Sequence, residues 1–242
     1  MLTKDIKFNK KIIQINYRDE SDLSVIDEIF VDKMYRCVEP IILNTKYHIL
    51  DIGAHIGLFS IYASILNPDA IIIALEPEQE NYALMKENVK LNHCKNITTK
   101  QLALSGSDEK TVPLYVNENS HNHSTLTPKH LTTLPPDHTD VPATSLENLL
   151  AQPSFAMATA GKVGLLKMDI EGAEYDIIEN MEDGTWNMIE NIIVEYHEFE
   201  NKNRAVLEDI IRKHGFSVEH FPNHYDKRFG LLLCRNKGVH GS

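Results

Sequence analysis

Short apolar runs alternate with amphipathic segments along most of the chain. Four of these runs are almost continuously apolar until a polar or acidic residue ends them, which is typical of strands that helices cover on both faces. These predicted strands lie at about 47–51, 71–76, 162–170 and 191–198. Apolar residues recur at helical spacing over about 57–66, 77–92 and 202–214. The alternation predicts an α/β fold, with a mostly parallel sheet and right-handed crossovers.

Three more strands are predicted in the same domain, which we assign to residues 47–238. One covers about 97–104, and the last two lie near Phe216–His220 and Gly230–Arg235. A short polar loop joins the last two, which indicates an antiparallel pair.

Residues 1–46 form an N-terminal extension to this domain. They contain a strand-like segment, Lys11–Tyr17, and then a helical repeat with Ser21 or Asp22 available as the N-cap. Tyr35 follows in a segment that we expect to lie across the mouth of the ligand crevice. Either the extension only packs on the domain, or it caps the bound ligand.

Residues 117–143 have a different composition, rich in Thr, Asn and Ser. Such a composition predicts a loop, and loops of this length are often functional. The segment holds four histidines, His121, His123, His130 and His138. Their spacing matches no zinc-ligand pattern, so we predict no metal site and expect the loop to face the substrate.

Composition excludes several classes of protein. The 24 Lys and Arg against 35 Asp and Glu give a formal net charge of −11, and so acidic a chain lacks the clustered cations that bind nucleic acid. The three cysteines are far apart, which favours a reducing compartment. The N-terminus has no signal-peptide pattern, and no apolar run is long enough to span a bilayer. We therefore expect a cytoplasmic protein with neither a nucleic-acid nor a membrane partner; the sequence does not indicate the oligomeric state.

Polar groups end four of the predicted strands. Asp51 and Glu76 end the first two, and Asp169–Glu171 and Glu195–His197 end two later ones. Ligands of open α/β sheets bind beyond the carboxyl ends of the strands. We therefore expect these groups to converge on one functional site.

The loop after Asp51 indicates which ligand binds there. Gly53 and Gly57 allow positive φ and a close approach of the ligand to the main chain, and Glu76 can accept hydrogen bonds from both ribose hydroxyls. A dinucleotide fingerprint needs three glycines, whereas this loop has two. Asp51 would repel a diphosphate but suits the ammonium group of a methionine moiety. These features favour S-adenosylmethionine over NAD.

Five motifs follow one another along the chain: Asp51–Gly57, Ala74–Pro77, Val141–Glu147, Leu166–Glu174 and Ile193–His197. Over about residues 30–200 they resemble successive signatures of FkbM-type methyltransferases, which are class I enzymes that use S-adenosylmethionine. The resemblance implies a Rossmann-like class I methyltransferase fold. Such a fold has a mostly parallel seven-stranded sheet, one antiparallel C-terminal strand and helices on both faces.

The resemblance also implies a role for each part of the cofactor site. Asp51 and the backbone of the loop should hold the methionine end, Glu76 the ribose, and the strand exit after residue 101 the adenine, with Asp169 beside the methyl donor. We add Tyr35 as a cofactor contact from the extension. The family commonly has Asn where His55 stands, so only its backbone is expected to contribute. The cofactor-binding candidates are Asp51, Gly53, Ala54, His55, Gly57, Glu76, Leu102, Ala103, Asp169 and Tyr35.

The same family typically methylates hydroxyl groups of sugars, polyketides or other small metabolites, which implies a small-molecule or glycan acceptor. A hydroxyl nucleophile needs a proton acceptor near neutral pH. His197 or Asp169 could serve, and Glu195 is a further catalytic candidate. Glu171 and Glu174 are candidate substrate contacts. His197 could instead only pack at its strand end, and Glu174 could only stabilise a helix N-terminus.

Two other classes of function stay open at this point. One is a nucleotide- or dinucleotide-dependent oxidoreductase on a similar fold, against which the missing third glycine and Asp51 argue. The other is a catalytically silent protein that binds the cofactor.

Overall fold

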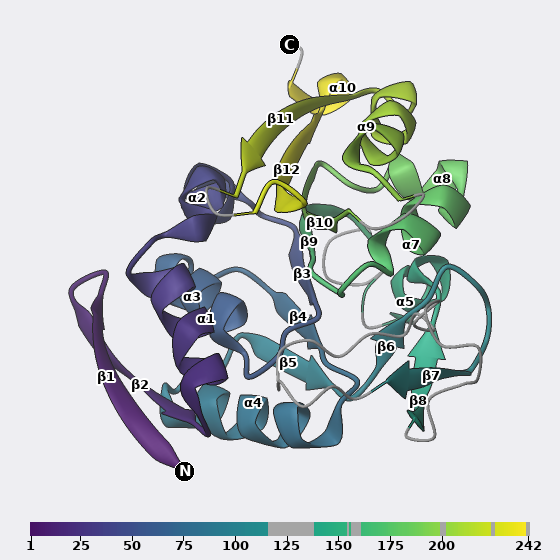
Figure 1. Ribbon diagram of the computed structural model, residues 1–242. Helices are drawn as coiled ribbons and strands as arrows, with labels where there is room; N and C mark the ends of the chain where they lie inside the picture. Colours follow the sequence, from purple (N-terminus) through teal and green to yellow (C-terminus); the bar gives the residue numbers. More distant parts are fainter. Residues whose placement is uncertain (116–137, 154, 156–160, 199–201, 224–225, 241–242) are drawn as a thin grey trace.

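The computed structural model of the protein (Figure 1) describes residues 1–115, 138–153, 155, 161–198, 202–223 and 226–240. Its centre is a seven-stranded sheet with the order β11-β12-β10-β9-β3-β4-β5, in which β12 runs antiparallel to both of its neighbours. The strands of this sheet are β3 (His48–Ile52), β4 (Ile72–Leu75), β5 (Ile97–Lys100), β9 (Val163–Met168), β10 (Asn191–His197), β11 (Phe216–Pro222) and β12 (Phe229–Asn236). The predicted fold class is confirmed, including the antiparallel strand near the C-terminus.

Helices cover both faces of the sheet (Figure 1). One core forms under α5, α7 and α9, and another under α1, α2 and α3. Neighbouring residues of β3 face opposite cores, Leu50 the first and Ile49 the second, as the pleat of a strand requires. The helices are α1 (Glu20–Phe30), η1 (Met34–Val38), α2 (Glu39–Asn44), α3 (Leu58–Leu66), α4 (Gln79–Leu91), α5 (Leu146–Leu150), α7 (Glu174–Asn180), α8 (Asp183–Trp186), α9 (Arg204–Lys213) and α10 (Lys237–His240).

Local sequence signals set the ends of the helices that were predicted. Gly57, with φ of +89°, immediately precedes α3. The Glu78 carboxylate accepts a hydrogen bond from Asn81 N at 2.6 Å and so caps α4. Asn203 caps α9, which ends before Gly215 in the left-handed conformation that is common after helices. The helices predicted at about 57–66, 77–92 and 202–214 are confirmed to within two residues.

The N-terminal extension begins with a hairpin of β1 (Leu2–Phe8) and β2 (Lys11–Tyr17) beside α1 and α4 (Figure 1). The predicted β2 is confirmed, whereas β1 was not predicted because charged residues interrupt its apolar ones. The predicted N-cap of α1 is wrong. Asp19 is the N-cap, since its extended backbone lets its carboxylate accept hydrogen bonds from the N–H groups of Ser21 and Asp22.

Two further predictions need correction. The strand expected over 97–104 is two strands, because after β5 the chain leaves the main sheet and β6 (Ala103–Leu104) pairs with β8. β8 (His138–Thr144) also pairs with β7 (Thr111–Tyr115), so the last part of the predicted loop is a strand. Its pattern is hard to recognise because only Val141 and Ala143 are buried. The rest of that loop, with His121, His123 and His130, lies outside the described residues.

Among the described residues, no helix combines the length and the apolar character that crossing a membrane requires.

Candidate active site

A cavity of about 1150 Å³ opens at the carboxyl ends of β3, β4, β9 and β10. The predicted candidates that line it are Gly53, His55, Glu76, Leu102, Ala103, Asp169, Glu171, Glu195 and His197. Residues of α1, η1 and the β11–β12 hairpin complete the wall. The polar strand ends therefore converge, as predicted, with Asp51 as the exception.

The loop after β3 is held in left-handed conformations at three positions. Gly53, His55 and Gly57 have φ of +73°, +51° and +89°. A Cβ atom on Gly53 would lie 1.9 Å from the backbone oxygen of Asp169, so only glycine allows the loop to pack against the end of β9. Gly53 and His55 line the cavity, while Ala54 is buried behind them against Met85.

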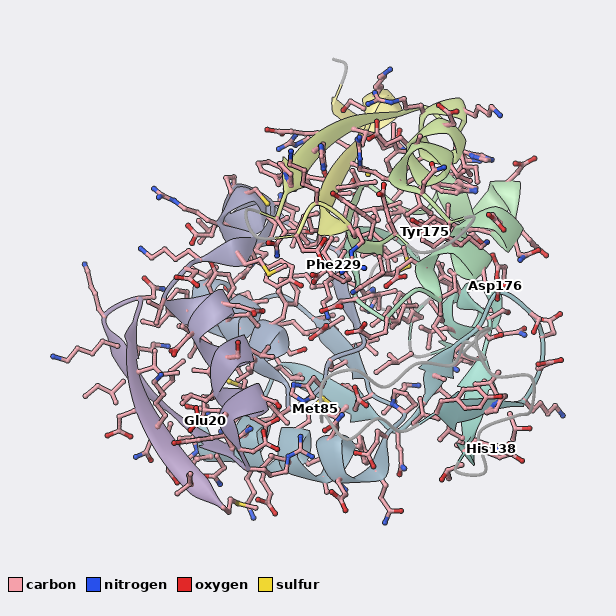
Figure 2. All side chains as sticks on the ribbon, viewed as in Figure 1. Glu20, Met85, His138, Tyr175, Asp176 and Phe229 are labelled. Carbon is pink, nitrogen blue, oxygen red and sulfur yellow. The ribbon has the colours of Figure 1, made fainter. Side chains whose placement is uncertain are left out.

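Gly57 also lies behind the cavity wall, where a Cβ atom would meet the Met85 side chain at 2.9 Å. Met85 belongs to α4 and is labelled in Figure 2. Ala54 and Gly57 thus shape the loop from behind.

Glu76 follows β4 and lines the cavity although it is only 5% exposed. Its Oε2 accepts a hydrogen bond from His55 N at 2.8 Å, and its Oε1 accepts one from Glu78 N at 3.0 Å. The Asn81 amide also donates to Oε1, at 3.4 Å. Burial raises the pKa of Glu76, although the hydrogen bonds oppose this. The carboxylate is therefore fixed in orientation by the loop and by the start of α4.

Asp51 is fully buried and does not line the cavity. It forms an ion pair with Lys167 at 3.1 Å and accepts a hydrogen bond from Ser60 Oγ at 2.7 Å. Lys167 Nζ also donates to Gly53 O at 2.7 Å and lies 3.7 Å from the Asp169 carboxylate. Burial alone would lower the pKa of Lys167, but its attraction to Asp51 and Asp169 outweighs this and raises it.

Lys167 is the residue of this group that was not assigned a role from the sequence. Its signal was a charged side chain in an otherwise apolar strand, since lysines are almost never buried unless they are paired. In the structure Lys167 contacts Asp51, the backbone of Gly53 and Asp169. Asp51 therefore affects the cavity indirectly, by fixing the position of Lys167.

Tyr35 lies in η1, where it is 3% exposed and packs edge-on against Phe59 at 4.8 Å between ring centroids. Burial raises the pKa of Tyr35 well above its ordinary value. It does not line the cavity, although its neighbour Met34 does.

His197, at the end of β10, is enclosed by carboxylates. Its Nδ1 lies 3.3 Å from Glu174 and its Nε2 3.5 Å from Glu171. Burial would lower the pKa of His197, but Glu174 and then Glu171 raise it to about 10. Burial raises the pKa of Glu171 to about 7, and raises that of Glu195 well above its ordinary value with a further contribution from Asp169.

Glu174 and Glu171 differ in their access to the cavity. Glu174 is fully buried and accepts a hydrogen bond from Ile170 N at 2.8 Å, so it supports His197 from behind. Glu171, in the loop after β9, lines the cavity. Its φ of +55° is a strained backbone conformation of the kind that is often found at functional sites. Phe229, near the middle of Figure 2, packs edge-on against His197 at 5.4 Å between ring centroids.

Asp169, Glu171 and His197 each offer one ligand atom, and these atoms lie within 4.8 Å of one another. The three could therefore hold a metal ion, which the sequence did not predict. Of the four histidines in residues 117–143, His138 is the one within the described residues; it lies on β8 near the edge of the molecule (Figure 2), where its ring contacts Tyr115.

The sheet order and the cavity at its strand ends define the class I methyltransferase fold. Two solved structures share this fold. The METTL16 methyltransferase domain matches with a TM-score of 0.52 and 12% identity, over 93% of this chain and 72% of that one. The magnesium protoporphyrin IX methyltransferase ChlM from Synechocystis PCC 6803, solved with bound SAM, matches with a TM-score of 0.51 and 10% identity, over 91% and 86%.

The chain belongs to the FkbM methyltransferase family, because the model of the methyltransferase FkbM domain matches residues 51–218. Methyltransferase sdnD from Sordaria araneosa is 28% identical over 219 residues, which are 80% of this chain and 82% of that protein. The 31-O-demethyl-FK506 methyltransferase FkbM of Streptomyces tacrolimicus is 25% identical over 211 residues, 79% and 80% of the two chains. The predicted family is confirmed, and the protein is an S-adenosylmethionine-dependent methyltransferase.

The residues of the cavity fit this cofactor. Glu76 offers a carboxylate that suits hydroxyl groups, Leu102 gives an apolar wall, and Asp169 adds a second carboxylate to the same cavity, which suits a cationic ligand. The volume exceeds what one small ligand needs, which leaves room for an acceptor beside the cofactor.

Proposed function

We propose that the protein transfers the methyl group of S-adenosylmethionine to a hydroxyl group of a small-molecule or glycan acceptor, such as a sugar or a polyketide. The observation that carries this proposal is one cavity with two kinds of wall. Glu76 and the glycine loop form a nucleoside-binding wall, while Asp169, Glu171 and His197 place proton-accepting and proton-donating groups in the same space. The name of the FkbM relative, a demethyl-FK506 methyltransferase, supports the choice of a hydroxyl.

In this proposal the cofactor lies along the ends of β3 and β4. Glu76 holds the ribose, and Leu102 and Ala103 border the adenine. The Gly53–Gly57 backbone approaches the methionine end, with Asp51 acting through Lys167, which it holds at 3.1 Å. Tyr35, within η1, contributes only by packing against Phe59, since it does not line the cavity.

When bound, the cofactor supplies an activated methyl group. The protein must then hold the acceptor oxygen in line with that group, which provides most of the catalysis, and must receive the hydroxyl proton. The ring nitrogens of His197 lie 3.5 Å from Glu171 and 3.3 Å from Glu174, so the two carboxylates favour the protonated ring, which is poorly suited to accept a proton. A cavity-lining carboxylate, Asp169 or Glu171, then accepts the proton, with Glu195 beside them.

The test combines binding with an acceptor screen. Calorimetry should show that the protein binds S-adenosylhomocysteine and does not bind NAD(P). Hydroxylated metabolites and glycans, each paired with an analogue in which the hydroxyl is replaced by hydrogen or by an amine, should then be incubated with S-adenosylmethionine and analysed by mass.

Gain of one methyl group by the hydroxylated member of a pair alone would support the proposal. Methylation of the amine analogues with none of the alcohols would show that the enzyme is an N-methyltransferase. Binding of NAD(P) without a response to S-adenosylhomocysteine would overturn the proposal as a whole.

A further inference from the structure

A network of polar contacts joins the N-terminal extension to the cofactor loop. The Arg18 guanidinium binds both carboxylate oxygens of Asp22, with Nε and Nη2 each at 2.9 Å. Asp22 also has His55 as a neighbour, whose Nε2 lies 3.2 Å from Oδ1. Asp22 is fully buried, so its charge depends on its protein partners, Arg18 and His55 among them, rather than on water.

Both arms of this network end on Glu76. In one arm, Asp22 contacts the His55 ring, and the backbone N–H of His55 donates to Glu76 at 2.8 Å. In the other, Arg18 donates to Asn81 Oδ1 at 2.6 Å, and the amide nitrogen of Asn81 donates to Glu76 at 3.4 Å. The residue expected to hold the ribose is thus fixed by two residues from outside the family match of 51–218.

A second connection runs parallel to the first. Asn88 of α4 accepts a hydrogen bond from Asn16 N at 2.8 Å and donates to Asn16 O at 3.1 Å. The same side-chain amide also donates to Ile56 O at 3.1 Å, inside the cofactor loop. β2 and the loop are therefore held against the same helix.

The conformation of the loop explains why such support is needed. His55 has φ of +51°, which a residue with a Cβ atom adopts only when its surroundings hold it there. A loop that leaves this conformation part of the time binds its ligand more weakly, in proportion to the time lost.

We propose that Arg18 and Asp22 are positioning residues for the cofactor: through His55 and Asn81 they hold the loop and Glu76 in the binding conformation. Neither is a catalytic residue, because their contacts reach the cavity only through other side chains. The inference rests on the proposed role of Glu76 at the ribose.

The test is the affinity of Asp22→Asn for S-adenosylhomocysteine, measured by calorimetry. Asparagine keeps the size of the side chain but removes the charge that pairs with Arg18 and His55. We expect the Kd to rise about 10-fold, which corresponds to about 1.4 kcal/mol, with the kcat at saturating cofactor changed less than 2-fold, on the order of the precision of such comparisons.

Asp19→Ala is the matched control. Asp19 caps the same helix through the N–H groups of Ser21 and Asp22, and it has no contact with His55 among the hydrogen bonds and ion pairs of the described residues. Its loss should destabilise α1 by an amount typical of an N-cap while leaving the Kd unchanged. If both variants weaken binding in parallel with their loss of stability, the role of Asp22 is only structural and the proposal fails.

A double-mutant cycle with His55→Asn gives an independent result. Because one of the two arms runs through the His55 ring, Asp22→Asn should have a smaller effect on the Kd in the His55→Asn background, where only the arm through Arg18 and Asn81 remains. Arg18→Lys should be intermediate, since a lysine cannot bind both oxygens of Asp22 in the same fork. Additive effects would overturn the inference. Wild-type protein that does not bind S-adenosylhomocysteine would instead refute the proposed function.

Discussion

Replacing Glu76 by Gln tests whether the Glu76 carboxylate accepts a hydrogen bond from the ribose of the cofactor. Oε2 accepts one hydrogen bond from His55 N, and Oε1 accepts two, from Glu78 N and the Asn81 amide. A carboxylate has about four lone-pair positions, so about one remains, on Oε2, for a hydroxyl. The geometry therefore favours a single strong contact to one ribose hydroxyl, fewer than the two expected from the sequence.

The size of the effect follows from this count. A hydrogen bond to a charged group contributes about 1.5–3 kcal/mol, so Glu76→Gln should raise the Kd of S-adenosylhomocysteine about 10- to 150-fold. Stability should change by only about 1 kcal/mol, because relief of the buried charge offsets the mismatch between the new amide and a neighbouring N–H group. Alanine is the poorer choice, since it would leave both buried N–H groups without an acceptor.

The assay is calorimetry with S-adenosylhomocysteine and with its 2′-deoxy and 3′-deoxy analogues. For the wild-type protein, one of the two deoxy analogues should have a higher Kd than S-adenosylhomocysteine. The ratio of these two Kd values should be about the same as the ratio that Glu76→Gln causes for S-adenosylhomocysteine itself. In Glu76→Gln that analogue and the parent ligand should bind alike. If the analogue is weakened equally in both proteins, Glu76 does not contact that hydroxyl, and the reasoning is refuted.

Other predictions concern the remaining parts of the site. Asp169→Asn should lower kcat about 100-fold with an almost unchanged Kd for S-adenosylhomocysteine; unfolding in a thermal melt would instead make Asp169 structural. Bonds to His55 and Arg18 hold the pKa of Asp22 well below its ordinary value, so its stabilisation is complete above the unfolded pKa of about 3.9 and is lost as the pH falls below it. Urea unfolding should therefore show Asp22→Asn to be less stable than wild type by about 3 kcal/mol at neutral pH, with the difference shrinking near about pH 3; a constant difference would contradict this. Both ring nitrogens of His197 already lie within 3.5 Å of carboxylates, so we expect turnover to survive dialysis against EDTA, whereas loss that Mg²⁺ restores would assign a cation to Asp169, Glu171 and His197. Phe229→Ala should raise the KM of the acceptor without changing the Kd of the cofactor product, and an equal change in both would place Phe229 at the cofactor.

The parts that could be predicted from sequence are those in which the signal lies within one short segment. Continuous apolar strands, capped helices and the polar residues at strand ends could all be predicted, because each is determined by residues that are adjacent in the sequence. β8 was missed because only two of its residues are buried, and the N-cap of α1 was misplaced because several nearby residues could serve.

The contacts that could not be predicted join segments far apart in the chain. The residues around Asp51 in the sequence do not indicate that Lys167 lies 3.1 Å from its carboxylate, or that Asp51 does not line the cavity. His55 gave the weakest expectation in the loop, since it stands where the family commonly has Asn. Its partner, Asp22, belongs to another element, and only the packing of α1 on the domain brings the two together.

The two halves of the cavity are built from different parts of the chain. Glu76, Leu102 and the loop of residues 53–57 all lie within residues 51–218, the part that matches the family. Another part of the wall comes from residues between 24 and 34, in α1 and up to the start of η1, and from residues 221–223 and 229–231 of the β11–β12 hairpin, all of which lie outside that match. Members of the family share a methyl donor and the transfer of its methyl group, so the segments that match the family should hold the cofactor and the groups that accept the proton. Segments outside the match can then differ from one acceptor to another. We therefore expect acceptor selection to reside in these two flanking walls. The extension then serves both ligands, because α1 lines the acceptor side while Asp22, on the same helix, braces the cofactor loop.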